Sequence, residues 1–409
     1  MNTYEEIRTW LYEQLPMYQR QGASAYKPGL EKMEAFMGYL GDPHKQFSSI
    51  HVAGTNGKGS TAHMITSVLM EAGYKVGLYT SPHLKDFSER IRINGIAIEI
   101  AFVVSFVQEH KAYFLEAQLS FFELTVGMSF AYFKEQQIDF AVVEVGLGGR
   151  LDATNVIIPI LAVITNIGFD HTQFLGNTLE AIAGEKAGII KKNIPVVIGE
   201  TQEETTTVFM TIADELKAPI VWADIVEVEP YQTDLNGLYQ KKNKHTAIVA
   251  LQTLHLDQLH EEHIRIGLQQ VVSNTHLQGR WQMLDKNPLV VADVTHNAAG
   301  FAFVIEQIKQ TTFHKLHLVL GFVKDKNLEL IFSLLPQNAT YYFCVPNIGR
   351  AEEISVLMNL AEKYTLNANA YESVEIAYKS VTKNAEHNDF IYVGGSTFVV
   401  AEILKKNSL

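Results

Sequence analysis

The amino-acid sequence predicts an α/β protein of two domains, the first built on a P-loop and a mainly parallel sheet, the second smaller and Rossmann-like. Three observations support this fold class. A glycine-rich loop near residue 54 stands between a strand and a helix, several nearly continuous apolar runs are typical of buried parallel strands, and strand and helix patterns alternate again after residue 282. The expected domains are residues 1–276 and 283–409, joined by a linker over 277–282.

The first domain is organised around the glycine-rich stretch 48–61, SSIHVAGTNGKGST. An apolar run ends at Val52, and a helix-compatible run over 62–72 follows the glycines. Backbone N–H groups in such a loop point inward, the helix N-terminus adds partial positive charge, and Lys58 adds a full one. The pattern is typical of a P-loop ATPase domain and predicts a polyphosphate cradle made by Gly54, Thr55, Asn56, Gly57, Lys58, Gly59 and Ser60.

The match to the general P-loop pattern, G-x-x-x-x-G-K-[ST], is imperfect. Val52 replaces its first glycine, and Gly59 offers no hydroxyl to a magnesium ion. A glycine-rich connection carrying a chance lysine is the alternative. The strand before the loop and the helix after it favour phosphate binding, because that context is what the mechanism requires.

Composition limits the cellular location and the classes of binding partner that we expect. A chain of 409 residues with 47% hydrophobic and 19% charged residues suits globular domains, and it has no apolar run of about 18 residues that would predict a membrane span. The net charge of −12 disfavours nucleic-acid binding. The N-terminus lacks the apolar core of a secretory signal, and the single cysteine, Cys344, cannot form an intrachain disulfide. We expect a cytoplasmic monomer that binds neither nucleic acid nor membrane.

The N-terminal elements follow from apolar spacing. Helical spacing predicts helices over 4–15 and 30–40, separated by a polar loop, 18–28, that we expect at the surface. Between the P-loop helix and residue 140 we expect a strand over 75–80, a β-like alternation with a turn over 89–95, and helices over 99–117 and 120–137.

The rest of the first domain alternates buried strands with helices. Apolar runs predict strands over 140–145, 161–167 and 194–198. Helices are expected from a cap at Asn177 or Thr178 to about 187, after residue 243 to about 254, and over 261–271, while 201–235 is a less decisive αβ stretch. In the second domain we expect strands over 289–292, 317–320, 341–345 and 390–393, with a helix over 299–310.

Three polar side chains that are distant in sequence stand at the carboxyl ends of predicted strands: Ser81, Glu144 and His171. These strand ends line one crevice in an open parallel sheet, so we expect the three groups to converge beside the phosphates. A carboxylate on a buried strand, such as Glu144, needs a partner or a metal. Magnesium prefers oxygen ligands, so His171 read alone is a structural histidine. Residues 146–149 lack the strand–loop–helix unit of a dinucleotide site, and we reject that interpretation.

Several long motifs resemble those of folylpolyglutamate synthase and dihydrofolate synthase, members of the Mur ligase superfamily. In order they are GTNGKGS at 54–60, SPHL at 81–84, EVGLGGRLDATN at 144–155, DH followed by LG within 170–176, and EKAGI at 185–189. The resemblance covers essentially the whole chain. It implies that ATP, with Mg²⁺, drives amide formation between L-glutamate and dihydropteroate or a reduced folate through an acyl phosphate.

The resemblance also implies roles for individual residues. Ser81, Glu144 and His171 would hold magnesium, and Lys186, which alone would be an exposed helix lysine, corresponds to a lysine that is carbamylated and supports the metal. Catalysis would involve Lys58, Lys186, His171 and Arg280. Nucleotide contacts are implied for Asn243, Arg280, Asp293 and His296, and the pteridine would lie against Ser120, Phe121, Phe122, Glu123, Leu151, Asp152 and Ala153, with the loop 18–28 at the border of its pocket.

Read as isolated residues, these positions have ordinary alternatives. Arg280 would be a solvated loop residue, whereas as part of the hinge it could bind phosphate when the domains close. Phe121 and Phe122 would be core residues. Two positions depart from the family pattern: Tyr239 replaces the usual histidine before Gln240, and Asn327 replaces the usual second aspartate of Asp-Lys-Asp, which leaves their roles open.

Two other functions fit parts of the sequence. Another Mur-type ligase that extends cell-wall precursors would need a different domain before the P-loop, and only about 50 residues precede it here. A P-loop switch protein that hydrolyses ATP without ligation would release ADP independently of glutamate. The sequence leaves open whether dihydropteroate, a reduced folate or both are accepted.

Overall fold

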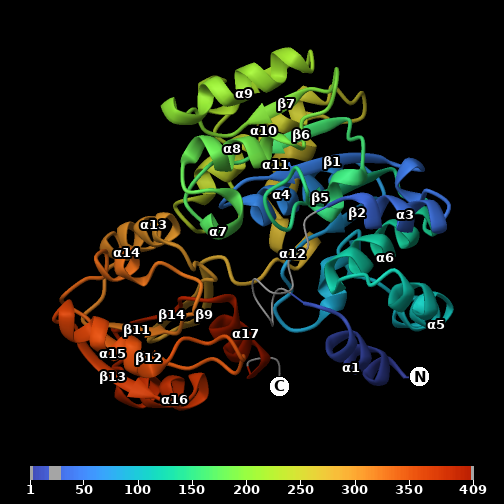
Figure 1. Cartoon of the computed structure of the whole chain (residues 1–409). Helices are drawn as coiled ribbons and strands as arrows, with labels where there is room; N and C mark the ends of the chain where they lie inside the picture. The colour runs from blue at the N-terminus through green and yellow to red at the C-terminus, as the bar shows by residue number, and fades with distance from the viewer. Residues whose placement is uncertain (1–2, 18–28, 407–409) are drawn as a thin grey trace. The chain divides into compact units, whose positions relative to one another are not determined.

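The computed structural model describes residues 3–17 and 29–406, in two compact units (Figure 1). The first contains the chain up to Asp234 together with Gln240–Leu277, and the second contains Leu235–Tyr239 and the chain from Gln278 onward. Each unit has its own sheet, so the predicted α/β class is confirmed. The expected polar loop 18–28 lies outside the described residues.

The first unit has an eight-stranded sheet in the order β4-β3-β2-β5-β1-β6-β7-β8. It is parallel except where β3 pairs with β2 and β4. Because β1 lies between β5 and β6, the loop that follows β1 starts in the middle of the sheet. The strands are β1 Ser48–Ala53, β2 Val76–Tyr79, β3 Ile91–Ile93, β4 Ile96–Ala97, β5 Phe140–Glu144, β6 Leu161–Ile164, β7 Val196–Ile198 and β8 Ile220–Trp222.

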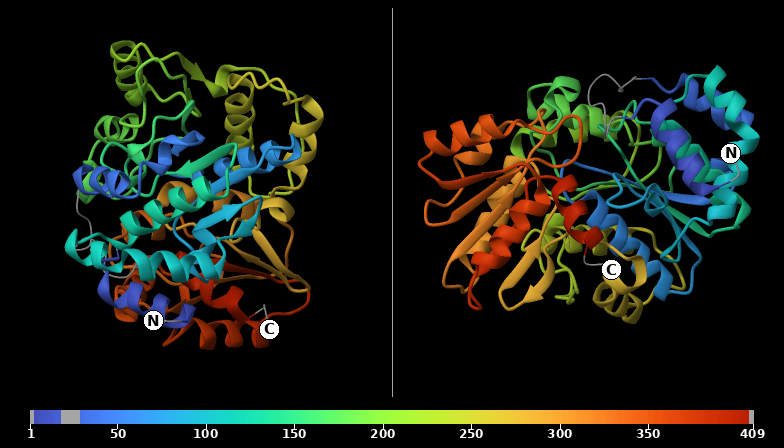
Figure 2. Two further views of the ribbon diagram at one scale, coloured as in Figure 1. Left: turned by 90° about the vertical axis from the view of Figure 1, so that its right-hand side faces the viewer. Right: turned by 90° about the horizontal axis from the view of Figure 1, so that it is seen from below.

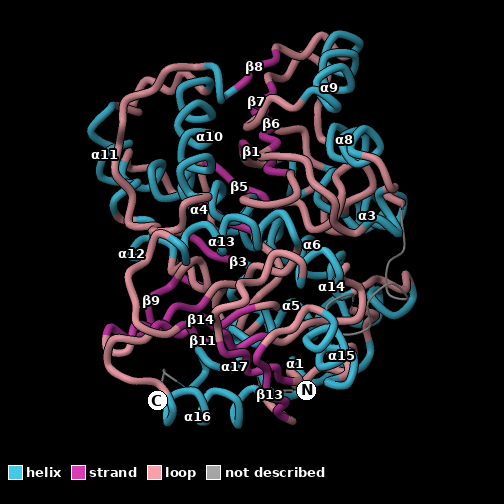
Figure 3. Tube along the Cα trace, turned by 90° about the vertical axis from the view of Figure 1, so that its left-hand side faces the viewer, coloured by secondary structure: helices cyan, strands magenta, loops and turns pink. Residues whose placement is uncertain are grey.

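Helix α4, Lys58–Glu71, follows the P-loop and is buried along most of its length. It packs on β1, β2 and β5, and α10, α11 and α12 pack against it, as Figure 3 shows for the labelled helices. Because strands and helices pack on several sides of α4, Gly59 to Leu69 are all buried and this helix carries few charges. The partner helices are α10 Gln240–Thr253, α11 Glu261–Gln269 and α12 Val271–Thr275.

Besides the packing around α4, the first unit has two clusters of buried apolar residues. One joins the N-terminal helices to β2 and β5, and the other joins α8 and α9 to β6 and β7. Two alternate residues of β5, Ala141 and Val143, belong to the first of these clusters, as the two-residue period of a strand requires. The remaining helices are α1 Tyr4–Gln14, α3 Glu31–Tyr39, α5 Ile100–Glu116, α6 Phe121–Glu135, α7 Thr172–Leu175, α8 Leu179–Ala187 and α9 Glu203–Glu215, with 3-10 turns η2 Pro43–Lys45, η3 Phe87–Arg90, η4 Ala153–Val156 and η5 Ala223–Ile225.

The second unit has a six-stranded sheet in the order β13-β12-β11-β14-β10-β9, in which only β9 is antiparallel. The core of one face is made with α13, α14 and α15, whereas α16 and α17 pack on the other face (Figure 2). The strands are β9 Gln282–Lys286, β10 Leu289–Ala292, β11 Leu316–Leu320, β12 Thr340–Cys344, β13 Asn367–Tyr371 and β14 Phe390–Gly394, and the helices are α13 Ala298–Lys309, α14 Leu328–Phe332, α15 Ile354–Lys363, α16 Val374–Asn384 and α17 Thr397–Lys406.

A short segment before α10, residues 235–239, groups with the second unit. The Leu238 N–H donates to Gln307 Oε1 at 2.7 Å, and Gln307 Nε2 donates to the Asn236 carbonyl at 2.9 Å. These bonds attach the segment to α13. The bounds 1–276, 277–282 and 283–409 stay predictions, and the sequence pattern did not indicate this excursion of the chain.

Within the part of the chain that the structure describes, no helix combines the length and apolar character needed to cross a membrane.

Candidate active site

The P-loop runs from the end of β1 to the start of α4 and requires glycine at two positions. Gly54 has φ +142° and Gly57 has φ +84°, conformations that side chains with a Cβ rarely adopt. A Cβ on Gly54 would lie 1.9 Å from Thr165 Oγ1, and one on Gly57 would lie 2.1 Å from Asn243 Oδ1. Gly57 is also the N-cap of α4, so the positive end of this helix opens onto the loop.

The segment after β6 supports the P-loop from one side. Thr165 Oγ1 donates to the Asn56 carbonyl at 2.6 Å, the Thr55 N–H donates to the Asn166 carbonyl at 2.9 Å, and the Asn56 N–H donates to Asn166 Oδ1 at 3.0 Å. Thr165 and Asn166 were not among the predicted site residues. The signal that could have found them is the one that identified Ser81, since both follow an apolar strand at its carboxyl end.

Two lysines from different helices converge on one carbonyl of the loop. Lys58 Nζ donates to the Gly54 carbonyl at 3.0 Å and to that of Thr55 at 3.2 Å, and Lys186 Nζ donates to the same Gly54 carbonyl at 2.9 Å. Lys186 is only 4% exposed, so the expectation of an exposed helix lysine is wrong. Burial first, and then the nearby Lys58 ammonium, lowers the pKa of Lys186 to about 7, against the opposing effect of Asp170 and Asp152.

Ser81 and Glu144 come together because β2 and β5 are neighbours in the sheet. The Ser81 N–H donates to Glu144 Oε2 at 3.0 Å, and Glu144 is 4% exposed. His171 is half-buried at the start of α7, with Nε2 3.9 Å from Asp170 Oδ1. Residues 3–17 and 29–406 contain no group of three or more His, Cys, Asp or Glu side chains placed to hold a metal. A serine whose backbone contacts one buried carboxylate nevertheless fits magnesium, which commonly takes one or two carboxylates and completes its shell with water and phosphate.

The motif 146–155 packs against the end of α8, which carries Lys186. Arg150 Nη2 lies 2.8 Å from Glu185 Oε1, and the Arg150 N–H donates to the Glu185 carbonyl at 2.7 Å. The Asp152 carboxylate accepts from the Leu147 N–H at 2.8 Å, and burial raises the pKa of this carboxyl group. Leu151 is half-buried, and Ala153 is buried at the start of η4.

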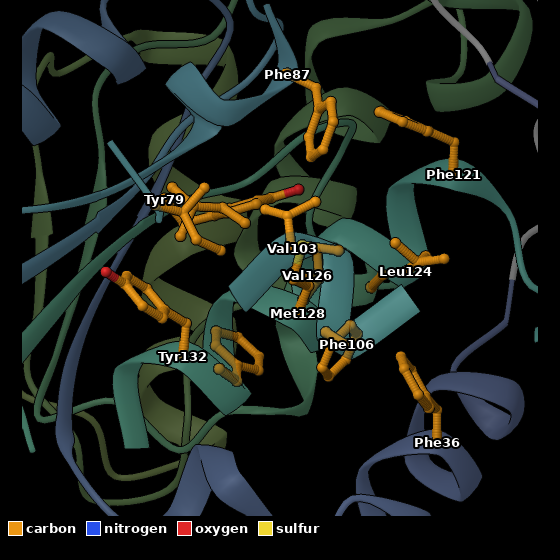
Figure 4. Close-up of a cluster of buried hydrophobic side chains, with 14 of the residues drawn as sticks. Phe36, Tyr79, Phe87, Val103, Phe106, Phe121, Leu124, Val126, Met128 and Tyr132 are labelled. Atoms are coloured by element: carbon orange, nitrogen blue, oxygen red, sulfur yellow. The ribbon is translucent and has the colours of Figure 1, made fainter. Parts of the chain in front are cut away.

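The predicted pteridine segment begins α6. Ser120 and Glu123 form a capping box, in which Ser120 Oγ accepts from the Glu123 N–H at 3.2 Å and Glu123 Oε2 accepts from the Ser120 N–H at 2.7 Å. Phe121 is 1% exposed and belongs to the core cluster in Figure 4. Phe122 is half-buried and touches the loop after β5, since a Cβ on Gly146 would lie 2.4 Å from Phe122 Cζ. The pteridine contacts of both rings stay predictions.

Helix α10 supports the P-loop helix through two amide side chains. Asn243 Nδ2 donates to Gln240 Oε1 at 2.9 Å, and Gln240 Nε2 donates to Ser60 Oγ at 3.1 Å. Both amides are buried. Asn243, a predicted nucleotide contact, therefore lies directly behind Gly57 in the first unit.

In the second unit, the predicted residues lie on the loops that flank β9 and β10. The Asp293 carboxylate is 1% exposed. His296 Nδ1 lies 3.0 Å from the Val294 carbonyl oxygen. Arg280 is half-buried, with Nη1 3.3 Å from the Gly279 carbonyl oxygen. Asn327 caps α14, where its Oδ1 accepts from the Leu330 N–H at 3.4 Å, so this departure from the family pattern has a local structural role.

Comparison with known proteins identifies two family models along the chain. The Mur ligase middle domain matches residues 52–255, and the glutamate ligase domain of Mur ligases matches residues 279–397. The dihydrofolate synthase/folylpolyglutamate synthase of Bacillus subtilis is 33% identical over 98% of this chain and 99% of its own length. A probable bifunctional folylpolyglutamate synthase/dihydropteroate synthase of Haloferax volcanii is 34% identical over 92% of this chain, which spans only 48% of that longer protein.

Solved structures agree with this similarity. Escherichia coli FolC in complex with DHPP and ADP is 29% identical, with a TM-score of 0.87 and coverage of 99% of this chain and 98% of that one. A bifunctional folylpolyglutamate synthase/dihydrofolate synthase with Mn, AMPPNP and L-glutamate bound is 32% identical, with a TM-score of 0.84 and coverage of 94% and 95%.

Proposed function

The chain belongs to the folylpolyglutamate synthase/dihydrofolate synthase family of Mur ligases, and from this premise we propose that it joins L-glutamate to dihydropteroate, to a reduced folate, or to both, using ATP. The observation that carries the proposal is the convergence of Lys58 and Lys186 on the Gly54 carbonyl of the P-loop. In a chain whose net charge is −12, the Lys58 ammonium and the N-terminus of α4 place positive charge at this loop, and the partly uncharged Lys186 amine lies beside it. Such a site suits a polyphosphate far better than a neutral ligand.

The chemistry follows from the poor leaving group of a carboxylate. A carboxylate oxygen of the acceptor attacks the γ-phosphorus of ATP, the bond from that phosphorus to the β,γ-bridging oxygen breaks, and an acyl phosphate and ADP result. The glutamate amine then attacks the acyl carbon, the carbon–oxygen bond to phosphate breaks, and the amine gives up a proton as the amide forms. Protein groups contribute positioning and charge neutralisation in both steps.

We assign the phosphate-binding role to Lys58, whose ammonium offsets charge on the transferred phosphoryl group. Arg280, which the family implies as a catalytic residue, would contribute a second cation. Ser81 and Glu144, with the histidine implied by the family, His171, would hold a divalent metal ion, which when bound supplies further charge neutralisation on the phosphates. The remaining family-implied nucleotide contacts, Asn243, Asp293 and His296, are part of the same proposal.

Lys186 has the chemical character that carbamylation requires. Its pKa of about 7 leaves a large fraction of the amine uncharged near neutral pH, and the uncharged amine is the form that attacks carbon dioxide. The nitrogen–carbon bond forms as the amine releases a proton, and the product is a carbamate anion. We propose this modification on the basis of the family and of the lowered pKa together.

One assay decides the proposed function. Purified protein is given ATP and labelled L-glutamate, with dihydropteroate and tetrahydrofolate offered separately, and both ADP and labelled amide are measured. We expect ADP release to require glutamate and one of the acceptors. ADP release that is independent of both would instead identify an ATPase, and the proposal would be abandoned. The same purification, with a size measurement in solution, tests the expected monomer, and fractionation of cells tests the cytoplasmic location.

A further inference from the structure

Arg280 stands between two residues that both have positive φ, so its direction depends on how the backbone on each side is held. Gly279 has φ +69° and Trp281 has φ +46°. The Gly279 carbonyl accepts from the Val294 N–H at 3.0 Å, which fixes the backbone before Arg280. A tryptophan with positive φ is unusual, and such a conformation persists only where neighbouring groups enforce it.

The backbone after Arg280 is held by a buried carboxylate. The Trp281 N–H donates to Asp293 Oδ2 at 2.7 Å, and the Tyr239 hydroxyl donates to the same oxygen at 2.5 Å. The other oxygen, Oδ1, accepts from the Thr295 N–H at 2.9 Å and from Thr295 Oγ1 at 2.5 Å. Asp293 thus accepts four hydrogen bonds from protein, which is the usual capacity of a carboxylate.

Tyr239 comes from the segment before α10 that groups with the second unit. Its hydroxyl therefore connects that segment to the carboxylate that holds Trp281. A second buried phenol, Tyr392, provides a contrast. A Cβ on Gly394 would lie 2.7 Å from Tyr392 Oη and 2.8 Å from the Asp293 carbonyl oxygen, yet this hydroxyl has no hydrogen-bond partner among the described residues.

We propose that Asp293 and Tyr239 are positioning residues, which together hold the Trp281 amide and so set the direction in which Arg280 presents its guanidinium. The inference rests on the proposed function, in which Arg280 binds the transferred phosphoryl group. It assigns Asp293 a positioning task besides the nucleotide contact implied by the family, and it gives Tyr239, which departs from the family pattern, a specific role. Arg280 is the group that touches phosphate, and the other two act through it.

The first test measures, without an activity assay, how firmly Asp293 and Tyr239 hold the Trp281 amide; we call these three residues the clamp. Hydrogen exchange of the Trp281 amide is followed in the full-length wild type, in Tyr239→Phe and in the matched control Tyr392→Phe. Both substitutions remove one buried phenol oxygen near Asp293, but only the first removes a hydrogen bond. Loss of a bond to a charged group should speed exchange at Trp281 about tenfold in Tyr239→Phe, with no change in the control. Equal exchange in Tyr239→Phe and wild type would overturn the proposal.

The second test is a double-mutant cycle on kcat with whichever acceptor the wild type uses. Tyr239→Phe should lower kcat about tenfold and leave KM for the acceptor within about twofold, since Tyr239 is not among the residues proposed to contact the acceptor. In the Arg280→Ala background the same substitution should cause no further loss. Tyr239→His restores a donor and should recover most of the activity. Additive losses in the double variant would mean that Tyr239 acts independently of Arg280, and the proposal would fail.

The two tests separate this inference from the proposed function. If the wild type forms no glutamate amide with either acceptor, the proposed function fails, while exchange at Trp281 still decides whether the clamp exists. If Tyr239→Phe does not fold, Asp293→Asn takes its place in both measurements, because it keeps the side-chain shape but replaces one accepting oxygen with a donor. Unchanged exchange in Asp293→Asn would likewise overturn the proposal.

Discussion

The buried Lys186 should make the free energy of unfolding increase with pH, and replacing this lysine should remove that increase. Its pKa in the folded protein, about 7, lies below the ordinary value of 10.5, because burial disfavours the ammonium. Between these values the unfolded chain binds more protons than the folded one, so stability rises with pH. The penalty is present in full below pH 7 and disappears as pH rises towards 10.5.

The size of this increase follows from linkage: the free energy of unfolding changes by about 1.4 kcal/mol per pH unit for each proton by which the unfolded and folded states differ. Integrated from pH 7 to pH 9, this one group should raise the free energy of unfolding of the wild type by about 2 kcal/mol. Lys186→Met has nearly the same shape and no titrating group, so it should lack this increase. Lys186→Met should also lose ligase activity, because the amine and its carbamate are both absent.

The assay compares urea unfolding of the wild type and Lys186→Met at pH 7 and pH 9, followed by circular dichroism in buffers depleted of carbon dioxide. Taking the difference between the two proteins cancels the other titrating groups. The exposed Lys192, in the same region of the chain, provides Lys192→Met as a control for replacing a lysine with methionine at a position outside the core. A pH-independent difference for Lys186→Met would refute the reasoning about the buried amine.

Three further substitutions test the site. Lys58→Ala should abolish turnover while circular dichroism stays that of a folded protein, and near-normal activity would contradict the role assigned to the P-loop. Gly57→Ala should lower the free energy of unfolding by about 1–2 kcal/mol and weaken ATP binding, since its φ is +84° and the new Cβ would meet Asn243; unchanged stability and affinity would contradict the strain argument. Phe121→Ala should lower the free energy of unfolding by about 3–5 kcal/mol in urea titrations, whereas a raised acceptor KM with unchanged stability would make it a pocket residue.

Local patterns were sufficient for most elements of the fold. The P-loop, the apolar strands around it and the helices at 99–117 and 120–137 were predicted because glycine spacing and apolar periodicity act within a few residues. Element ends were less accurate, because tertiary contacts set them. The strand predicted over 161–167 ends at Ile164, where Thr165 and Asn166 turn to support the P-loop backbone.

The sequence by itself therefore determined the class of fold, the glycine-rich loop between a strand and a helix and, through long motifs, the family. Only the tertiary structure decided which side chains are buried together. By its local sequence Lys186 is an ordinary surface lysine, but in the folded protein the loop at 146–150 covers the end of α8 that carries it. The four donors on Asp293 come from three separate segments of the chain. Burial, shifted pKa values and shared hydrogen bonds arise from contacts between distant segments, and no local pattern of residues encodes them.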